Sequence, residues 1–314
     1  MRGDDPKRES PDLGQEVRAS GIEALSSRVT RYGSAKKRAL DVAQYIASLP
    51  KAGNPHAGKL AGVVSGCGEY LLFRHYFTVD QVRLHQANFC KKHLLCPLCA
   101  IRRGAKAMQA YLPRFEALTA SRPSLRPFLV TLTVKDGPDL LERFRHLQRA
   151  QSALWSRRRK ARSRDCAFAS VEAAVWSYEV KRGQGSGLWH PHLHMVALAE
   201  TAPDQVALRH QWEQITGDSY VCDVRPIDQA DAASGFLEVF KYALKFSDMT
   251  AADTYEAFRV LSGLRLVGSA GAFRGVEIPG ELTDEPLDDL PFVELLFRYL
   301  EGGYSLLKRS ARCE

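Results

Sequence analysis

The sequence predicts an α+β fold in which a split βαβ motif builds an antiparallel sheet with helices on one face. Three observations lead to this prediction. From residue 128 onward, short β-rich runs and stretches of helical spacing follow each other as strand, helix, strand, strand, helix, strand, helix. The 314 residues are 45% hydrophobic and 25% charged, which is typical of globular proteins. A group of cysteines precedes the sheet, so a separate metal-binding subdomain is expected there.

The elements are assigned from hydrophobic periodicity and from breaker residues. Apolar side chains at every third or fourth position predict helices, and short β-branched or alternating runs predict strands. The expected helices are 35–49, 100–118, 140–154, 204–216 and 235–246. The expected strands are 128–134, 173–180, 190–199 and 218–227. Residues 261–275 are expected to be loop-rich, and 290–303 to form a closing helix ended by Gly302 and Gly303.

On this pattern the chain divides into four parts. Residues 1–35 are polar and short of aromatic side chains, which predicts a disordered tail. Residues 36–120 form a helical and cysteine-rich zinc-binding region, 121–250 hold the sheet, and 251–314 form a C-terminal helical extension. No apolar run is long enough for a transmembrane helix, and the N-terminus lacks the apolar core of a signal peptide. We therefore expect a cytoplasmic protein with no membrane partner.

The charge balance favours a polyanionic partner. The net charge is +8 and the pI is near 9.1. Residues 143–164 hold nine Arg or Lys and no Asp or Glu, ending in SRRRKARSR. A basic run is often only a solvated helix face, but so many uncompensated charges favour contacts with phosphates. The DNA-binding candidates in this run are Arg157, Arg158, Arg159 and Lys160.

The stretch WHPHLHMVALA (Trp189–Ala199) holds three histidines at alternate positions. Because side chains alternate on a strand, His190, His192 and His194 project to one face. Three imidazoles on one face favour a metal site over histidines that only hydrogen-bond to their neighbours. Glu179, at the end of the preceding strand, would add an oxygen ligand. Nitrogen and oxygen ligands without thiolate suit Mn²⁺ or Mg²⁺, with other divalent ions as alternatives, and such an ion polarises a phosphoryl oxygen.

The stretch GFLEVFKYALKFSD offers a nucleophile. On a helix, Glu238 and Tyr242 lie one turn apart on the same face. A phenol needs activation, which a divalent ion and a nearby lysine, Lys245, would supply, while the carboxylate would act as general base. Lys241 is a further DNA-binding candidate. The alternative is that Tyr242 is a half-buried core aromatic and Glu238 is exposed. Taken alone, this stretch favours the alternative. The histidine strand and the basic segment make the catalytic interpretation equally strong.

Three stretches, in this order, resemble motifs of the replication initiators of rolling-circle plasmids, which are HUH endonucleases. FLVTLTV resembles the first motif, HPHLHMV the second and EVFKYALKFSD the third. ANFCKKHLLCPLCAIRRGAK is similar to the cysteine-rich stretch that these initiators carry upstream. The resemblance spans Cys67 to Asp248. It implies a five-stranded antiparallel sheet and makes residues 121–250 an HUH nicking domain.

The resemblance also implies the chemistry. Tyr242 would attack a phosphodiester at the plasmid origin, giving a 5′-phosphotyrosine link and a free 3′-OH that primes synthesis. His192 and His194 would hold the divalent ion, with His190 or Glu179 as third ligand. Because the third motif has a single tyrosine, the glutamate one turn before it would activate water for the final cleavage. The implied partners are supercoiled or single-stranded origin DNA and the host helicase and polymerase.

The cysteine cluster contains one zinc half-site, CPLC, which supplies Cys96 and Cys99 after Cys90. Structural Zn²⁺ takes four ligands. The alternative is a set of reduced cysteines packed in a core. The candidates for the fourth ligand are Cys67, which we prefer, and the competitors His93 and His85.

A bound zinc ion would order the start of the helix that follows the cluster. Arg102, Arg103 and Lys106 would then be placed where they could meet DNA phosphates. The sequence therefore predicts a second basic surface beside the zinc site.

Two other functions fit parts of the pattern. One is a non-catalytic, zinc-containing DNA-binding regulator in which the histidine strand is structural. The other is a hydrolase of small phosphoesters that uses the histidines but no covalent tyrosine. The three ordered motifs argue against the regulator, and the basic segment argues against the hydrolase. Tyr242→Phe separates the three, since it should abolish nicking and leave DNA binding or simple hydrolysis intact.

Overall fold

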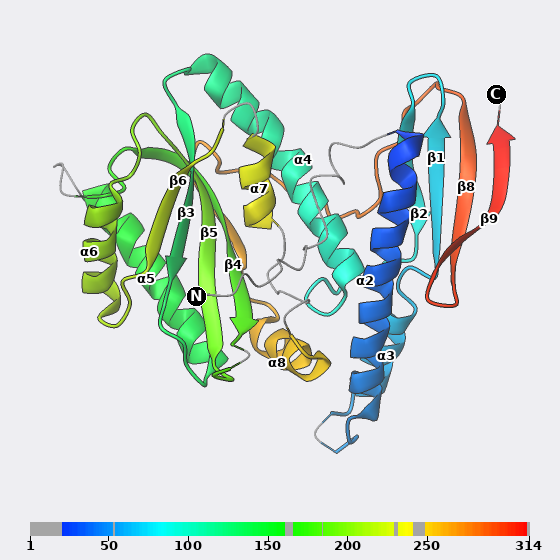
Figure 1. Ribbon diagram of the computed structural model, residues 1–314, viewed down its shortest axis with the longest axis horizontal. Coiled ribbons are helices and arrows are strands. Elements are labelled where there is room, and N and C mark those ends of the chain that lie inside the picture. Colours follow the sequence, from blue (N-terminus) through cyan, green and yellow to red (C-terminus); the bar gives the residue numbers. More distant parts are fainter. Residues whose placement is uncertain are drawn as a thin grey trace, which may run out of the picture.

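Two antiparallel sheets organise the chain, and the long helices α2 (Ile22–Ser48) and α4 (Pro97–Ser121) lie between them (Figure 1). The computed structural model describes residues 21–52, 54–160, 166–183, 185–228, 232–240 and 249–312. Among these residues, none of the helices combines the length and the apolar character that a membrane span requires.

The first sheet has five strands in the order β6-β3-β5-β4-β7, and each neighbouring pair is antiparallel. Helix α5 (Leu140–Lys160) connects β3 to β4, and β5 lies between these two strands, as a split βαβ motif requires. Helix α6 (Gln205–Thr216) then leads from β5 to β6. The strands are β3 (Arg126–Thr133), β4 (Val171–Arg182), β5 (Trp189–Ala199), β6 (Cys222–Pro226) and β7 (Val267–Gly271).

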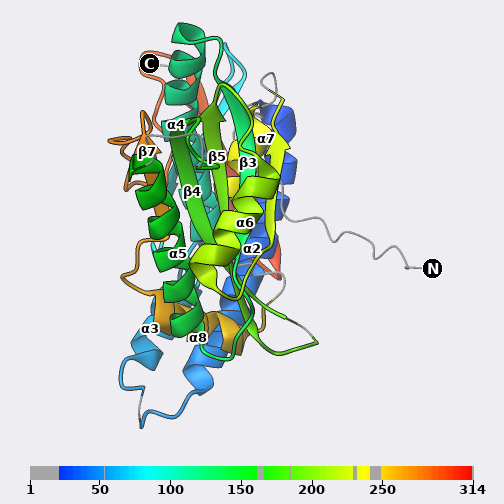
Figure 2. The same ribbon diagram turned by 90° about the vertical axis from the view of Figure 1, so that its left-hand side faces the viewer.

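Helices cover both faces of this sheet, so the prediction of helices on one face is wrong. Helices α5 and α6 pack on one face, where Val130 and Leu193 point (Figure 2). Helices α4 and α7 (Ala232–Phe240) pack on the other, against Val175 and Val196. The central strands are apolar on both sides, and such strands need a layer on each face. Helix α8 (Ala251–Leu261) closes the lower end of the first layer through Ala257.

The second sheet joins distant parts of the chain in the order β2-β1-β8-β9. Its first hairpin, which the sequence analysis missed, follows helix α3 (Ala57–Ser65). Residues from the cysteine-rich region and from the C-terminal part thus share one sheet, and the predicted division between them does not hold. The strands are β1 (Tyr70–Tyr76), β2 (Gln81–Ala87), β8 (Phe292–Leu300) and β9 (Gly303–Arg312).

The predicted closing helix over residues 290–303 is wrong. These residues form β8 and the turn into β9, and Gly302 (φ 90°) helps make that hairpin turn rather than ending a helix. Strand β1 offers its free edge to β8, so sheet pairing overrides a local pattern that suits either structure. The loop-rich segment 261–275 also supplies a strand, β7, at the edge of the five-stranded sheet.

Part of the predicted disordered tail is helical. Helix α2 begins at Ile22, and Leu25, Val29 and Tyr32 pack at helical spacing against the four-stranded sheet. Residues 1–20 of that predicted tail lie outside the described residues.

Candidate functional site

Strand β5 presents its three histidines to the face that α7 covers. Val196 and Leu198 lie in the cluster under α4 and α7, so the residues at alternate positions before them, His194, His192 and His190, project the same way. Leu193 and Met195, at the intervening positions, belong to the opposite cluster under α5. The predicted alternation of this strand is therefore confirmed.

The structure brings His192 and His194 together with Glu179. In the β4–β5 register, Glu179 lies directly opposite His192. Its two carboxylate oxygens are 3.4 Å from His192 Nε2 and 3.3 Å from His194 Nε2. All three side chains are buried, and one ligand atom from each lies within 4.8 Å of the others. Such a group could hold a metal ion.

Neighbouring groups orient both imidazoles. Thr131, opposite His194 on β3, lies 3.1 Å from His194 Nδ1, and the His190 carbonyl lies 3.4 Å from His192 Nδ1. Each Nδ1 is thus engaged, and each Nε2 faces the carboxylate. Burial lowers the pKa of His192, which favours the neutral imidazole that binds metals. Sequence analysis missed Thr131, although its alternation with apolar residues in FLVTLTV was visible.

His190 does not join this group. Its Nδ1 instead bonds to the carboxylate of Asp136, which lies just after β3. Of the two third ligands considered from the sequence, the structure brings Glu179 to the pair and turns His190 to Asp136. The carboxylate of Asp136, on the loop after β3, determines the orientation of His190. The alternation of residues along the strand could not predict this contact.

Helix α7 lies directly over this face. Ser177, opposite His194 in the register, donates a hydrogen bond to the Val239 carbonyl of α7. Glu238, the predicted general base, is half-buried on the same helix. Lys241, Tyr242 and Lys245 follow it in the sequence and lie outside the described residues.

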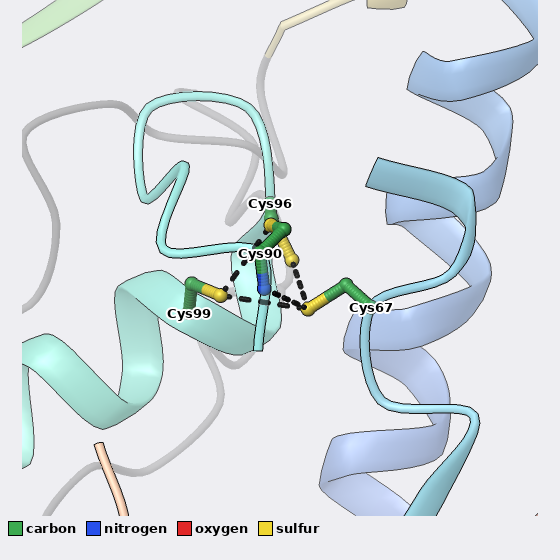
Figure 3. A group of neighbouring side chains, drawn as sticks. All are labelled: Cys67, Cys90, Cys96 and Cys99. Atoms are coloured by element: carbon green, nitrogen blue, oxygen red, sulfur yellow. Dashed lines mark hydrogen bonds between the residues drawn. The ribbon is translucent and has the colours of Figure 1, made fainter. Parts of the chain in front are cut away.

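The four predicted cysteines form a second group that could hold a metal (Figure 3). Cys67 lies between α3 and β1, Cys90 follows β2, and Cys96 and Cys99 lie at the start of α4. His93 is exposed and His85 lies on β2, so neither competitor belongs to the group.

The sulfur positions fit one tetrahedral ion. The Sγ atoms of Cys67 and Cys99 are 3.5 Å apart, those of Cys67 and Cys96 3.5 Å, and those of Cys90 and Cys99 3.6 Å. A disulfide would need about 2.05 Å, whereas zinc–sulfur bonds of about 2.3 Å place tetrahedral sulfurs roughly 3.8 Å apart. Hydrogen bonds within the group lower the pKa of Cys90 and raise the pKa values of Cys96 and Cys99. The hydrogen bond with Cys67 has the largest effect on each of the three. Without a cation, the four cysteines therefore cannot all be thiolates. A bound cation would compensate the negative charge of four thiolates.

Lys36 of α2 holds the loop that carries Cys67, and sequence analysis missed it. Its ammonium donates to the Cys67 carbonyl at 2.7 Å and also to the Ser65 carbonyl. The side chain is buried, which lowers its pKa. A lysine on the apolar side of a predicted helix was the signal available.

The predicted DNA contacts after the cysteines need correction. Arg102 is 1% exposed and donates to the Asp284 carboxylate, and Lys106 is 4% exposed. Neither cation can meet a phosphate on the surface. Arg103 is half-buried and donates to the Pro279 carbonyl at 2.8 Å. This part of α4 is the core of the junction between the two sheets rather than a basic surface.

The basic end of α5 remains accessible in part. Arg159 and Lys160 are exposed, whereas Arg157 donates to Gln214 and Arg158 lies over the Trp155 ring at 5.7 Å.

An antiparallel sheet with buried histidines and a carboxylate on one face, preceded by a four-cysteine group, is the arrangement expected of an initiator of plasmid replication. A family model described as "Replication protein" (Rep_1) matches residues 81–294. A protein named "Protein rep" from Streptococcus pneumoniae serotype 2 is 26% identical over 247 residues, covering 73% of this chain and 74% of that protein. Another from Bacillus amyloliquefaciens is 24% identical over 300 residues, covering 82% and 84%.

A third "Protein rep", from Lactiplantibacillus plantarum, is 25% identical over 261 residues, and the match covers 75% of this chain and 79% of that protein. No solved structure matches the chain. The chain belongs to the Rep_1 family of replication proteins, which confirms the resemblance to plasmid rolling-circle replication initiators.

Proposed function

We propose that this initiator nicks and rejoins plasmid origin DNA, with Tyr242 as nucleophile and a divalent ion held by Glu179, His192 and His194. The observation that carries the proposal is the buried trio on the face under α7, in a chain of a replication-protein family. A DNA-binding protein without catalysis has no need to bury two imidazoles and a carboxylate together at that place.

The trio suits a divalent ion. His194 Nε2 is buried, makes no hydrogen bond within the described part of the chain, and lies 3.3 Å from a carboxylate oxygen of Glu179, so a cation between these atoms would have a ligand on each side. Two imidazole nitrogens and a carboxylate suit Mn²⁺ or Mg²⁺. When bound, the ion polarises the scissile phosphate and offsets the charge that develops on it.

Chain connectivity supports Tyr242 as the nucleophile of this face. It comes three residues after Val239, whose carbonyl is bonded to Ser177, and three residues of extended chain span at most about 11 Å. Attack of the Tyr242 oxygen on phosphorus forms a 5′-phosphotyrosine and breaks the bond to the 3′ oxygen. The phenol proton goes to a base, and the leaving 3′ oxygen takes a proton and becomes the primer hydroxyl. Lys245 favours the phenolate, and Lys241 contacts the DNA backbone.

Glu238 acts at the end of the cycle. Its carboxylate takes a proton from water, whose oxygen attacks phosphorus at the final cleavage in place of a second tyrosine. The bond to the 3′ oxygen breaks, and that oxygen takes a proton and leaves as a 3′-OH. Its half-buried position on α7, next to the residue that bonds to β4, supports this role. Because water takes the place of a second tyrosine, the protein forms one covalent link to DNA in each cycle.

The four cysteines hold a structural Zn²⁺ in this proposal. All four ligand positions are filled by thiolates, which leaves no place for substrate and is typical of structural zinc. In this proposal the host helicase unwinds the duplex from the nick, and the host polymerase extends the 3′-OH.

Covalent trapping tests the proposal. Supercoiled plasmid that carries the gene and its flanking DNA is incubated with protein and Mn²⁺ and then denatured in SDS. Wild type, Tyr242→Phe and His192→Ala/His194→Ala are compared, with His56→Ala, an exposed histidine at the start of α3, as matched control. We expect an adduct in wild type and control only.

Two results would contradict the proposal. An adduct that persists in Tyr242→Phe would assign the nucleophile to another tyrosine. DNA binding by wild type without nicking or adduct would favour the zinc-containing regulator.

A further inference from the structure

The side of α5 that faces away from the sheet carries a stripe of basic residues. The helix buries its apolar positions against the five-stranded sheet, so residues on the opposite side of its 3.6-residue turn face solvent. We call the exposed cations there the α5 stripe: Arg145, Arg149, Arg159 and Lys160.

Nearby acids do not compensate the stripe. Within the described residues, neither Arg145 nor Arg149 forms an ion pair or a hydrogen bond, and α5 has no acidic residue after Glu142. Arg143, on another side of the same helix, does pair with Asp218 at 2.8 Å. In the described part of the chain, Arg145 and Arg149 therefore lie without an ion pair on the outward side, where they produce a local positive potential.

A groove lies at the C-terminal end of the stripe. It has a volume of about 650 Å³ and lies between the C-terminal end of α5, the start of β4 and helix α6. Its lining combines the polar side chains of Arg157, His210 and Gln214 with one acidic residue, Asp204, and several alanines, and it contains no Phe, Tyr or Trp. The Asp204 carboxylate accepts from the Val206 and Ala207 amides at the start of α6. Arg157 donates to Gln214 at 3.1 Å, which turns its guanidinium toward this groove.

We infer that the α5 stripe and this groove bind the backbone of duplex DNA beside the nick site. The inference rests on the proposed function, since it concerns DNA that the same initiator engages. From Arg145 to Lys160 the helix rises about 22 Å, which matches roughly six base pairs. The occupant is duplex rather than single-stranded DNA, because single strands are held by stacking on aromatic side chains and the groove has none.

A membrane is a poorer partner for this surface. None of the exposed large apolar side chains of the described chain lies on α5, so the stripe has nothing to insert into lipid. The stripe also lies on the opposite sheet face from His192 and His194. The duplex held here is thus a different stretch of DNA from the strand that is cleaved.

Duplex binding measured by fluorescence anisotropy tests the inference. A labelled duplex of arbitrary sequence, and one of its strands alone, are titrated with protein at several salt concentrations. The variants are Arg145→Gln/Arg149→Gln and Arg145→Glu/Arg149→Glu. The control, Lys37→Glu/Lys59→Glu, makes the same charge change at exposed lysines of α2 and α3. Thermal unfolding of each variant confirms that the fold is kept.

We expect the charge reversal to weaken duplex binding at least about tenfold, and the glutamine variant to reduce the salt slope by about two. The control should stay within about twofold of wild type. Nicking of a single-stranded oligonucleotide should be unchanged, so failure of catalysis and failure of this inference give different results. Unchanged duplex binding, an equal loss in the control, or a loss confined to the single strand would overturn the inference.

Discussion

The two groups that could hold a metal are assembled in different ways, and the difference indicates what each one does. Glu179, His192 and His194 come from two adjacent strands, so sheet register alone brings them together. The four cysteines come from loops and a helix start that join α3, β1, β2 and α4. A site on a sheet exists before an ion binds, whereas a site made of loops depends on the ion to fix those loops. We therefore expect ligand removal to abolish chemistry in the first case and folding in the second.

The largest effect is expected from Cys96→Ser. Cys96 is fully buried in the group, and loss of one thiolate leaves an incomplete zinc site in the core between α2 and the four-stranded sheet. We expect loss of bound zinc and destabilisation on the order of 5 kcal/mol. Metal analysis and denaturant unfolding measure both. Cys166→Ser, a buried cysteine outside the group, is the control and should keep its zinc.

His194→Ala should give the opposite result. Nicking should fall on the order of 10³-fold, because the variant lacks a metal ligand. The unfolding midpoint without metal should fall far less than in Cys96→Ser, since the change removes the contact with Thr131 and one buried ring but leaves the cysteine group intact. Initial nicking rates and thermal unfolding decide the comparison. A folding defect as large as that of Cys96→Ser would show that the two groups do not differ as stated.

A buried carboxylate, Asp284, links distant segments of the part of the chain that carries the cysteines. Asp284 accepts from Arg28 at 2.9 Å, from Arg102, and from the Leu84 amide at 2.7 Å. Burial raises the pKa of Asp284, but Arg102 and Arg28 together hold this pKa well below its usual range. Asp284→Asn should cost about 3 kcal/mol, because two buried cations lose their partner.

The pH dependence follows from the sign of that shift. A carboxyl with a depressed folded pKa contributes stability above its unfolded pKa of about 3.9, and this stability is lost as the pH falls below that value. Wild type should lose stability between about pH 4 and pH 2 more steeply than Asp284→Asn. Urea unfolding at a series of pH values measures this. Parallel curves would show that Asp284 is not the group that titrates.

His190→Ala should have the smallest effect and sharpens the histidine assignment. Because its Nδ1 bonds to Asp136 rather than facing Glu179, nicking should fall less than about tenfold. Comparison of Mn²⁺ titrations for His190→Ala and His194→Ala checks the prediction. A loss equal to that of His194→Ala would make His190 a ligand.

Patterns within a few residues predicted much of the fold. The four strands from β3 to β6, and helices α4, α5 and α6, lie where hydrophobic periodicity placed them. The closing helix failed because FVELLFRYL suits both structures, and only the free edge of β1 selects the strand. The assignment of Arg102 to DNA failed for a similar reason: its partner Asp284 lies far away in the sequence and enters the core with it.

The sequence by itself determined that His192 and His194 share one strand face and that Cys90, Cys96 and Cys99 lie close enough in the chain to meet. Both follow from backbone geometry, namely alternation along a strand and short spacing. Only the tertiary structure decided that Glu179 completes the histidine group, that Cys67 completes the cysteines, and that α7 covers the site. These pairings depend on strand register and on packing between distant segments, and no local pattern of residues encodes either.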